Sequence, residues 1–149
     1  MKIAHFVNLR VFSYEHEDEK KIEEKLKKLC PFDLAEEKIP VTRSSAKGFN
    51  EKKIIIFEIA LTKEKHTTKF CKNLKQFLSD DQKKLLVSLA GSRLDENLCF
   101  FIRLDKTKLL DEDRILITDS GNCFHIKLTI AAYPTTMENA LKVVKEWLS

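Results

Sequence analysis

Cys123 and His125 are the first residues that could do chemistry, because thiols and imidazoles bind metals and act in catalysis. They stand two residues apart in CFHIKLTI, which alternates polar and apolar residues, so a strand would place both on one face. Two ligands do not make a metal site, and no second pair has convincing spacing. A catalytic Cys–His pair would also need a third orienting group and a cleft. We therefore expect a structural role, with no catalytic residue, metal or cofactor.

Other enzyme motifs are also missing from the sequence. Neither GxGxxG nor GxxxxGK[ST] occurs, and SSAKG at 44–48 has one glycine, which favours an ordinary loop over a phosphate loop. The acidic pairs Glu17-Asp18 and Asp80-Asp81 fall in the first turns of predicted helices, where the helix dipole favours carboxylates. Capping explains them without catalysis, so the chain is expected not to be an enzyme.

The positive charge is concentrated in one segment. Residues 63–78 carry five lysines and one glutamate, which equals the net charge of +4 of the whole chain. At 100° per residue, four of the lysines fall within about 120° of arc opposite the apolar side of the predicted helix. These are Lys65, Lys69, Lys72 and Lys75. A polyanion would meet a row of ammonium groups there, although a solvated lysine face is also usual for an amphipathic helix.

The first predicted strand, residues 2–14, adds a second indication. Phe6, Asn8, Arg10, Phe12 and Tyr14 share one face, a mixture that could stack on the bases of single-stranded RNA and pair with its phosphates. A helix packed on this face would also bury Phe6 and Phe12, and we expect this packed interior.

Periodicity predicts an α+β fold. The expected strands are 2–14, 38–45, 53–62, 98–105, 114–119 and 123–132. The expected helices are 17–29, 63–78, a helix that a capping box at Ser79 starts and Gly91 closes, and a terminal helix that Pro134 and a capping box at Thr135 open. The order β-α-β-β-α-α-β-β-β-α indicates a mixed or antiparallel sheet of about six strands with helices packed on one side. Residues 53–62 are nearly all apolar, as expected of a strand covered on both faces or central in its sheet.

Length and composition limit the class of protein. The 149 residues, 43% of them hydrophobic, fit a single domain spanning 1–149. The sequence contains no run of 18 apolar residues, so we expect no membrane span and no membrane partner. Its first residues lack the pattern of a secretory signal. The four cysteines form no CxxC pair and are expected to be reduced and buried, as in a cytoplasmic protein.

Three stretches together resemble a known family. NLRVFSYEHEDEKKIEEKL, SRLDENLCFFIRLDK and KLTIAAYPTTMENAL occur in the order typical of the archaeal predicted RNA-binding or exosome-associated proteins. The resemblance implies a fold like that of ribosomal protein L-five, with RNA and exosome or ribosome-related proteins as partners. The chain looks divergent: His16 replaces a threonine, the loop 44–50 has one glycine and no histidine, and 107–110 replaces a glutamine-alanine stretch.

The most specific element of that resemblance is a repeated Arg-Leu-Asp, at Arg93–Asp95 and Arg103–Asp105. Each aspartate could pin its strand end by an ion pair with arginine, or could orient the arginine toward a phosphate. We expect RNA-backbone contacts from the lysine row together with Arg93, Arg103, Lys106 and Lys108. Of these, Arg103 and Lys106 are the better candidates, because they end a strand and enter a charged segment that is expected to be exposed.

Two other classes of function stay open from the sequence. The first is an assembly or scaffold protein whose sheet edge or apolar helix meets a protein partner, such as a second copy in a homodimer. The second is a small-molecule or metal-dependent enzyme, which would need a pocket that collects His66, His125, Cys123 or Asp105.

Overall fold

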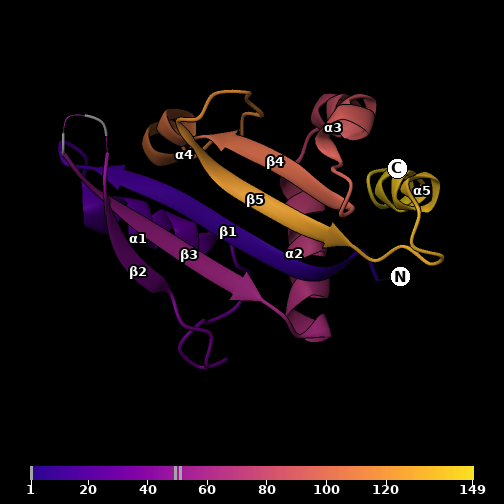
Figure 1. Cartoon of the computed structure of the whole chain (residues 1–149), viewed down its shortest axis with the longest axis horizontal. Helices are drawn as coiled ribbons and strands as arrows, with labels where there is room; N and C mark the ends of the chain where they lie inside the picture. Colours follow the sequence, from indigo (N-terminus) through magenta and orange to yellow (C-terminus); the bar gives the residue numbers. More distant parts are fainter. Residues whose placement is uncertain (1, 49, 51) are drawn as a thin grey trace. The chain divides into compact units, whose positions relative to one another are not determined.

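The computed structural model describes residues 2–48, 50 and 52–149 (Figure 1). Its elements, in chain order, are β1 (Ala4–Tyr14), α1 (Glu19–Lys28), β2 (Thr42–Lys47), β3 (Lys53–Leu61), α2 (Glu64–Phe77), α3 (Asp80–Arg93), β4 (Cys99–Asp105), α4 (Lys106–Glu112), β5 (Cys123–Ile130) and α5 (Met137–Trp147). The predicted loop at 44–50 is largely the end of β2; its Phe49 lies outside the described residues. Among the described helices, none has both the length and the apolar character needed to cross a membrane.

The strands form one open antiparallel sheet in the order β2-β3-β1-β5-β4. At its β2 edge, Thr42 lies opposite Glu58 and Lys47 lies opposite Lys53. The α+β class is confirmed, with one strand fewer than the six expected. The likeness to ribosomal protein L-five stays a prediction.

The predicted strand at 114–119 does not form. Residues 114–119 form only an isolated bridge, between Ile117 and Leu104. The charged stretch before them is the helix α4, whose N-cap Asp105 accepts a hydrogen bond from the backbone N–H of Lys108. Seven residues are too few to display a helical period, so the pattern concealed this helix.

The chain divides into two compact units. The first unit comprises residues 1–7, 61–102 and 127–149, and the second comprises 8–60 and 103–126. The expectation of a single domain stays a prediction. In the first unit α3 packs against α5, and the indole of Trp147 donates a hydrogen bond to the Cys71 carbonyl at 3.0 Å. Burying the indole is favourable only because its N–H has this acceptor.

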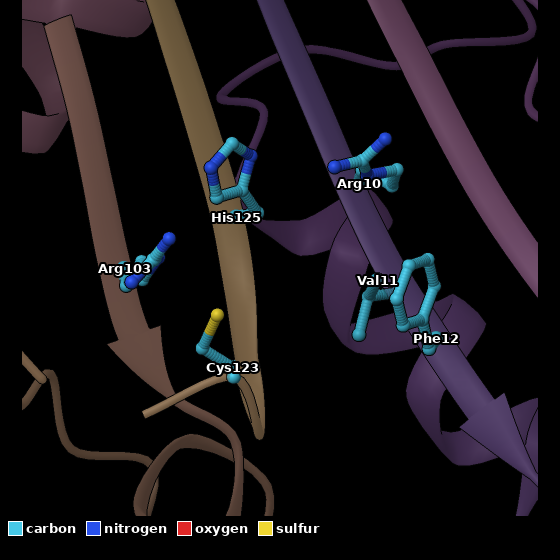
Figure 2. Close-up of a pocket in the computed structure, with 7 residues that line it drawn as sticks. Arg10, Val11, Phe12, Arg103, Cys123 and His125 are labelled. Carbon is cyan, nitrogen blue, oxygen red and sulfur yellow. The ribbon is translucent and has the colours of Figure 1, made fainter. Parts of the chain in front are cut away.

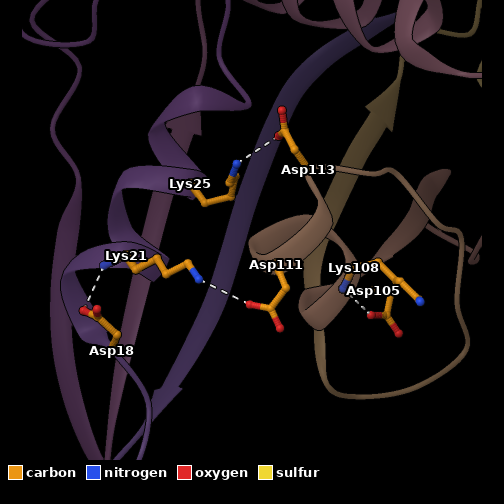
Figure 3. A network of polar contacts seen from close by, with 7 residues as sticks. All are labelled: Asp18, Lys21, Lys25, Asp105, Lys108, Asp111 and Asp113. Atoms are coloured by element: carbon orange, nitrogen blue, oxygen red, sulfur yellow. Dashed lines mark hydrogen bonds and ion pairs between the residues drawn. The ribbon is translucent and has the colours of Figure 1, made fainter.

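In the second unit α1 packs against α4. Two ion pairs link these helices: Lys21 Nζ lies 3.2 Å from an Asp111 carboxylate oxygen, and Lys25 Nζ lies 2.9 Å from one of Asp113 (Figure 3). Asp18 caps α1 by accepting from the backbone N–H of Lys21 at 3.2 Å. The acidic side chain thus has the capping role that its position predicted.

Strands β1, β3, β4 and β5 largely alternate between buried and more exposed residues, whereas all of β2 is exposed. Along β1, Val7, Leu9 and Val11 are buried, whereas Phe6 is 52% exposed and Phe12 is half-buried. The expectation that Phe6 and Phe12 face a packed interior is wrong, because the covered face is the aliphatic one. Of the two alternatives predicted for β3, coverage on both faces is wrong, since its residues alternate between buried and more exposed positions. The other alternative, a strand inside the sheet, fits its place between β2 and β1. The sheet therefore offers an uncovered face to solvent.

Helix boundaries follow local signals with two exceptions. The capping box predicted at Ser79 is present, with reciprocal hydrogen bonds between Ser79 and Gln82. However, α3 continues through Gly91 and ends at Arg93, so Gly91 does not close it. The cap of α5 is Thr136, which accepts from the backbone N–H of Asn139, and not Thr135.

Candidate nucleic-acid interface

The uncovered face of the second unit is hollowed. We call this place the strand-face hollow; its volume is about 220 Å³, and Arg10, Val11, Phe12, Arg103, Gly121, Cys123 and His125 line it. Figure 2 shows these side chains on three strands, with His125 and Cys123 on β5, Arg10 and Phe12 on β1 and Arg103 on β4. Two guanidinium groups and an aromatic ring thus share one depression, a combination suited to a phosphate and a base.

Each arginine of the hollow is held in place by a neighbour. The Arg10 guanidinium lies 5.5 Å from the centre of the Phe12 ring, a cation–π contact. Arg103 donates a hydrogen bond from Nη1 to the backbone carbonyl of Asp119 at 3.1 Å. By contrast, Arg43 and Arg114 lie within ion-pair distance of Glu19 and Glu112.

Cys123 and His125 lie on one face of β5, as predicted, and both line the hollow. Within the part of the chain that the structure describes, no group of three His, Cys, Asp or Glu side chains could hold a metal ion. Burial raises the pKa of the Cys123 thiol above its usual value of 9.0, although the positive charges of Arg103, Lys106 and Arg10 favour the thiolate. The thiol is therefore protonated at neutral pH in a cationic surrounding.

Lys106 is not a surface cation. Its side chain is only 2% exposed, and its Nζ donates to the Phe12 carbonyl at 2.7 Å and to the Glu17 carboxylate at 3.1 Å. The ammonium group also lies 4.9 Å from the centre of the Tyr14 ring. The expectation that Lys106 is exposed is wrong, because the Phe12 carbonyl of β1 and the Glu17 carboxylate of the β1–α1 connection compensate its burial.

The two aspartates of the repeated Arg-Leu-Asp have a common role. Asp95 accepts hydrogen bonds from the backbone N–H groups of Asn97 and Cys99, both at 2.9 Å. Asp105 accepts one from the backbone N–H of Lys108 at 2.9 Å (Figure 3). Each carboxylate fixes the backbone of the segment that follows it. The repeat is thus a repeated turn-and-cap geometry, which neither reading of the sequence anticipated.

The predicted lysine row lies on α2, in the first unit. Lys65, Lys69 and Lys72 are exposed, and Lys75 is half-buried. The opposite side of α2 carries the buried residues, His66, Thr67, Phe70, Cys71 and Leu74. Among the described residues, no carboxylate lies within 4.0 Å of the ammonium groups of Lys69, Lys72 and Lys75.

Several lysines of the second unit differ from Lys69, Lys72 and Lys75, because they are paired. Lys21, Lys25 and Lys27 of α1 each lie within ion-pair distance of a carboxylate. Lys108 is bonded in the same way to Glu112 at 2.8 Å. Neutralised lysines attract a polyanion less than isolated ones do. Lys69, Lys72 and Lys75 thus carry a charge that no described carboxylate compensates locally.

The predicted site residues are divided between the two units. Lys65, Lys69, Lys72, Lys75 and Arg93 belong to the first unit, whereas Arg103, Lys106 and Lys108 belong to the second. Arg93 is the last residue of α3 and is half-buried. For the enzyme alternative, His66 belongs to the first unit and Asp105 is a helix cap. Cys123 and His125 both line the strand-face hollow.

Sequence reasoning considered Arg10 and Phe12 as RNA contacts but left them out of the predicted site residues. Their signal was present, since aromatic and basic residues alternate on one face of the first strand. It was outweighed by the expectation that two phenylalanines on one face mark a packed interior.

Structure and surface together define the class: an α+β protein whose open sheet leaves one face uncovered and carries cationic and aromatic side chains there. A family model described as RNA binding matches residues 6–132. The chain therefore belongs to this family, and the resemblance to archaeal predicted RNA-binding proteins is confirmed.

Archaeal relatives extend over nearly the whole chain. The RNA-binding protein PAB1135 of Pyrococcus abyssi is 27% identical over 145 residues, which cover 97% of this chain and 94% of the relative. Protein AF2318 from Archaeglobus fulgidus has a crystal structure that superposes with a TM-score of 0.84 at 29% identity, covering 98% and 99% of the two chains. Mth689 from Methanothermobacter thermautotrophicus, a DUF54 protein, has a TM-score of 0.78 at 26% identity, covering 99% of each.

Proposed function

We propose that this protein binds RNA without catalysing a reaction, and that the lysine row of α2 contacts the phosphate backbone. Membership of the RNA-binding family and the name of its relative PAB1135 support RNA as the ligand. The contact residues are Lys65, Lys69, Lys72 and Lys75, with Arg93, Arg103 and Lys108 as further cations; Lys106 is left out because it is buried.

The observation that carries the proposal is the contrast between two sets of lysines. Lys69, Lys72 and Lys75 have no carboxylate within ion-pair distance among the described residues, whereas Lys21 and Lys25 of α1 are paired. A lysine face that serves only to solvate the helix does not require its lysines to be unpaired. Phosphate binding benefits from it, because an unpaired ammonium group gains more from a new anion than a paired one does.

The non-catalytic part is supported by the roles of the acidic side chains. Asp18, Asp95 and Asp105 accept hydrogen bonds from backbone N–H groups, and Glu17 is bonded to Lys106. These carboxylates are therefore occupied by structural contacts and are not arranged as an acid–base pair.

A charge-reversal experiment tests the surface. A variant with Lys69→Glu, Lys72→Glu and Lys75→Glu should lose about 100-fold in affinity for a fluorescent 12-nucleotide RNA at 0.1 M salt, since about three phosphate contacts are lost. Fluorescence anisotropy measures this loss.

The matched control reverses three other exposed lysines, one on each of three helices. Lys20→Glu, Lys84→Glu and Lys145→Glu change the net charge equally but leave the α2 row intact. The control should lose far less affinity. Equal losses in both variants would contradict the α2 row as the contact surface and leave only a general effect of net charge.

Self-association is the second candidate function, because β2 ends the sheet. All residues of Thr42–Lys47 are exposed, and β2 is hydrogen-bonded to β3 on one side in the strand order. An edge strand of this kind can pair with the same strand of a second copy. Light scattering after size-exclusion chromatography should give twice the chain mass if β2 has this role.

Association with exosome or ribosome-related proteins in the cytoplasm belongs to the same proposal. Its support is the family resemblance and the four free, buried cysteines, which suit a reducing compartment. Native purification followed by mass spectrometry should recover such partners. If no such partner is recovered from an RNA-rich preparation, only the RNA-binding part of the proposal would stand.

A further inference from the structure

The strand-face hollow has a composition that suits one nucleotide. None of the residues that line it within the described chain is an Asp or a Glu, and two are arginines. The hollow thus favours an anion. Its volume of about 220 Å³ is below the usual range of roughly 300–1,000 Å³ for sites that enclose a whole small molecule. It therefore suits part of a longer ligand better than a free metabolite.

The two arginines are prepared for different contacts. Arg103 uses Nη1 on the Asp119 carbonyl, which orients its planar group while other donors of the guanidinium can reach a phosphate. Arg10 lies over the Phe12 ring at 5.5 Å, so an aromatic ring and a delocalised cation form a flat, partly exposed platform. A nucleobase can stack on either member of such a pair.

Lys106 supports the strand segment that forms one wall of the hollow. Its ammonium group is bonded to the carbonyl of Phe12, in the same strand segment that carries Arg10. The strand is therefore fixed where the platform lies. A rigid support of this kind reduces the entropy lost when a ligand is bound.

We propose that the strand-face hollow is a nucleotide subsite for single-stranded RNA, in which Arg10 and Arg103 hold a phosphate and the Arg10–Phe12 platform stacks on an unpaired base. This inference rests on the proposed RNA binding and adds the strandedness of the ligand. Bases of an A-form duplex are stacked on one another, so they cannot present a face to this platform. The α2 row, in contrast, needs only phosphates and does not distinguish the two forms.

Two RNA probes separate the subsite from the lysine row. A fluorescent 12-nucleotide single strand and the duplex of the same sequence are titrated with the wild type and with a double variant, Arg10→Gln with Arg103→Gln. We expect the double variant to lose about 20-fold in affinity for the single strand, since two charged contacts disappear, and less than about twofold for the duplex. Phe12→Leu, which keeps all charges, should lose about fivefold for the single strand only.

Matched controls come from the other arginines of the second unit. Arg43→Gln with Arg114→Gln removes the same charge from side chains that are paired with Glu19 and Glu112, and should leave the affinity for both probes nearly unchanged. Circular dichroism and urea unfolding of each variant verify that it is folded. A single 4-thiouridine in the strand should crosslink to peptides that contain Phe12 or Cys123.

Several results would overturn the proposal. Equal losses for single strand and duplex, no loss in the double variant, or crosslinks confined to α2 would each place the nucleotide elsewhere. A phosphoserine peptide that binds as tightly as the single strand and displaces it would assign the hollow to a protein ligand. If the wild type binds neither RNA probe, the proposed function itself fails together with this subsite.

Discussion

The ammonium group of Lys106 lies 2.7 Å from the carbonyl oxygen of Phe12, a residue 94 positions earlier in the chain. The same group is bonded to the Glu17 carboxylate at 3.1 Å. A lysine that the sequence assigns to the surface therefore connects the start of α4 to the end of β1 in the second unit. Its role is to position the strand that carries Arg10 and Phe12.

Removing this buried cation should destabilise the protein. Lys106→Met removes the cation from the Phe12 carbonyl and leaves the Glu17 carboxylate with the backbone N–H of Tyr14 but no counter-charge, so the free energy of unfolding should fall by about 3 kcal/mol. Urea unfolding measures the change.

A double variant gives the control for this prediction. With Glu17→Gln added to Lys106→Met, no unpaired carboxylate remains, and part of the lost stability should return. Equal stability of the two variants would mean that the ion pair contributes nothing beyond the packing of the lysine stem.

Local patterns predicted the α+β class, the capping box at Ser79 and the exposure of the α2 row, because each depends on residues close together in the sequence. Lys106 could not be predicted in this way. Its burial depends on an acceptor 94 residues away, and a lysine without a known partner is expected to face water.

The two turn aspartates give a second prediction. Asp95→Ala and Asp105→Ala should each lower the free energy of unfolding by about 1 kcal/mol, because backbone N–H groups lose their acceptor. Differential scanning calorimetry measures both changes.

RNA affinity distinguishes this backbone-capping role of the aspartates from the alternative that the sequence left open, the orientation of arginines toward phosphate. If the aspartates oriented Arg93 and Arg103 toward phosphate, both variants would also bind RNA more weakly. We expect an unchanged affinity, with loss of stability alone.

Cys30 and Cys71 should react slowly with iodoacetamide in the folded protein. Burial raises the pKa of each thiol from 9.0 to about 12, so the reactive thiolate is about 1,000-fold rarer at pH 8 than in the unfolded chain. Mass spectrometry of peptides from native and urea-unfolded samples measures the two rates. Rapid labelling of the native protein would show that these thiols are accessible.

The same raised pKa values predict a loss of stability in alkali. An unfolded thiol releases its proton near pH 9, whereas the buried one keeps it up to about pH 12. The unfolded state therefore binds fewer protons in this window, and stability falls as the pH rises from 9 toward 12. Cys71→Ala should reduce the slope of the free energy of unfolding against pH, measured by urea titrations at pH 8.5, 9.5 and 10.5. An unchanged slope would mean that other groups cause the loss of stability.

The uncovered sheet face shows why the candidate site was only partly predictable. Both faces of β1 contain apolar side chains, so alternation alone could not tell which one helices cover. The aliphatic residues Leu9 and Val11 are buried, and the larger rings of Phe6 and Phe12 are left at the surface. Only the assembled sheet brings Arg103 and His125 to the same hollow as Arg10.

Salt dependence of RNA binding tests most directly whether ammonium groups of α2 hold the phosphates. For about four neutralised phosphates on a single strand, the logarithm of the binding constant should fall with the logarithm of salt concentration at a slope of about −3. Lys69→Glu, Lys72→Glu and Lys75→Glu together should reduce this slope to about −1. A wild-type slope near zero, or the same steep slope in the triple variant, would contradict phosphate binding by this helix.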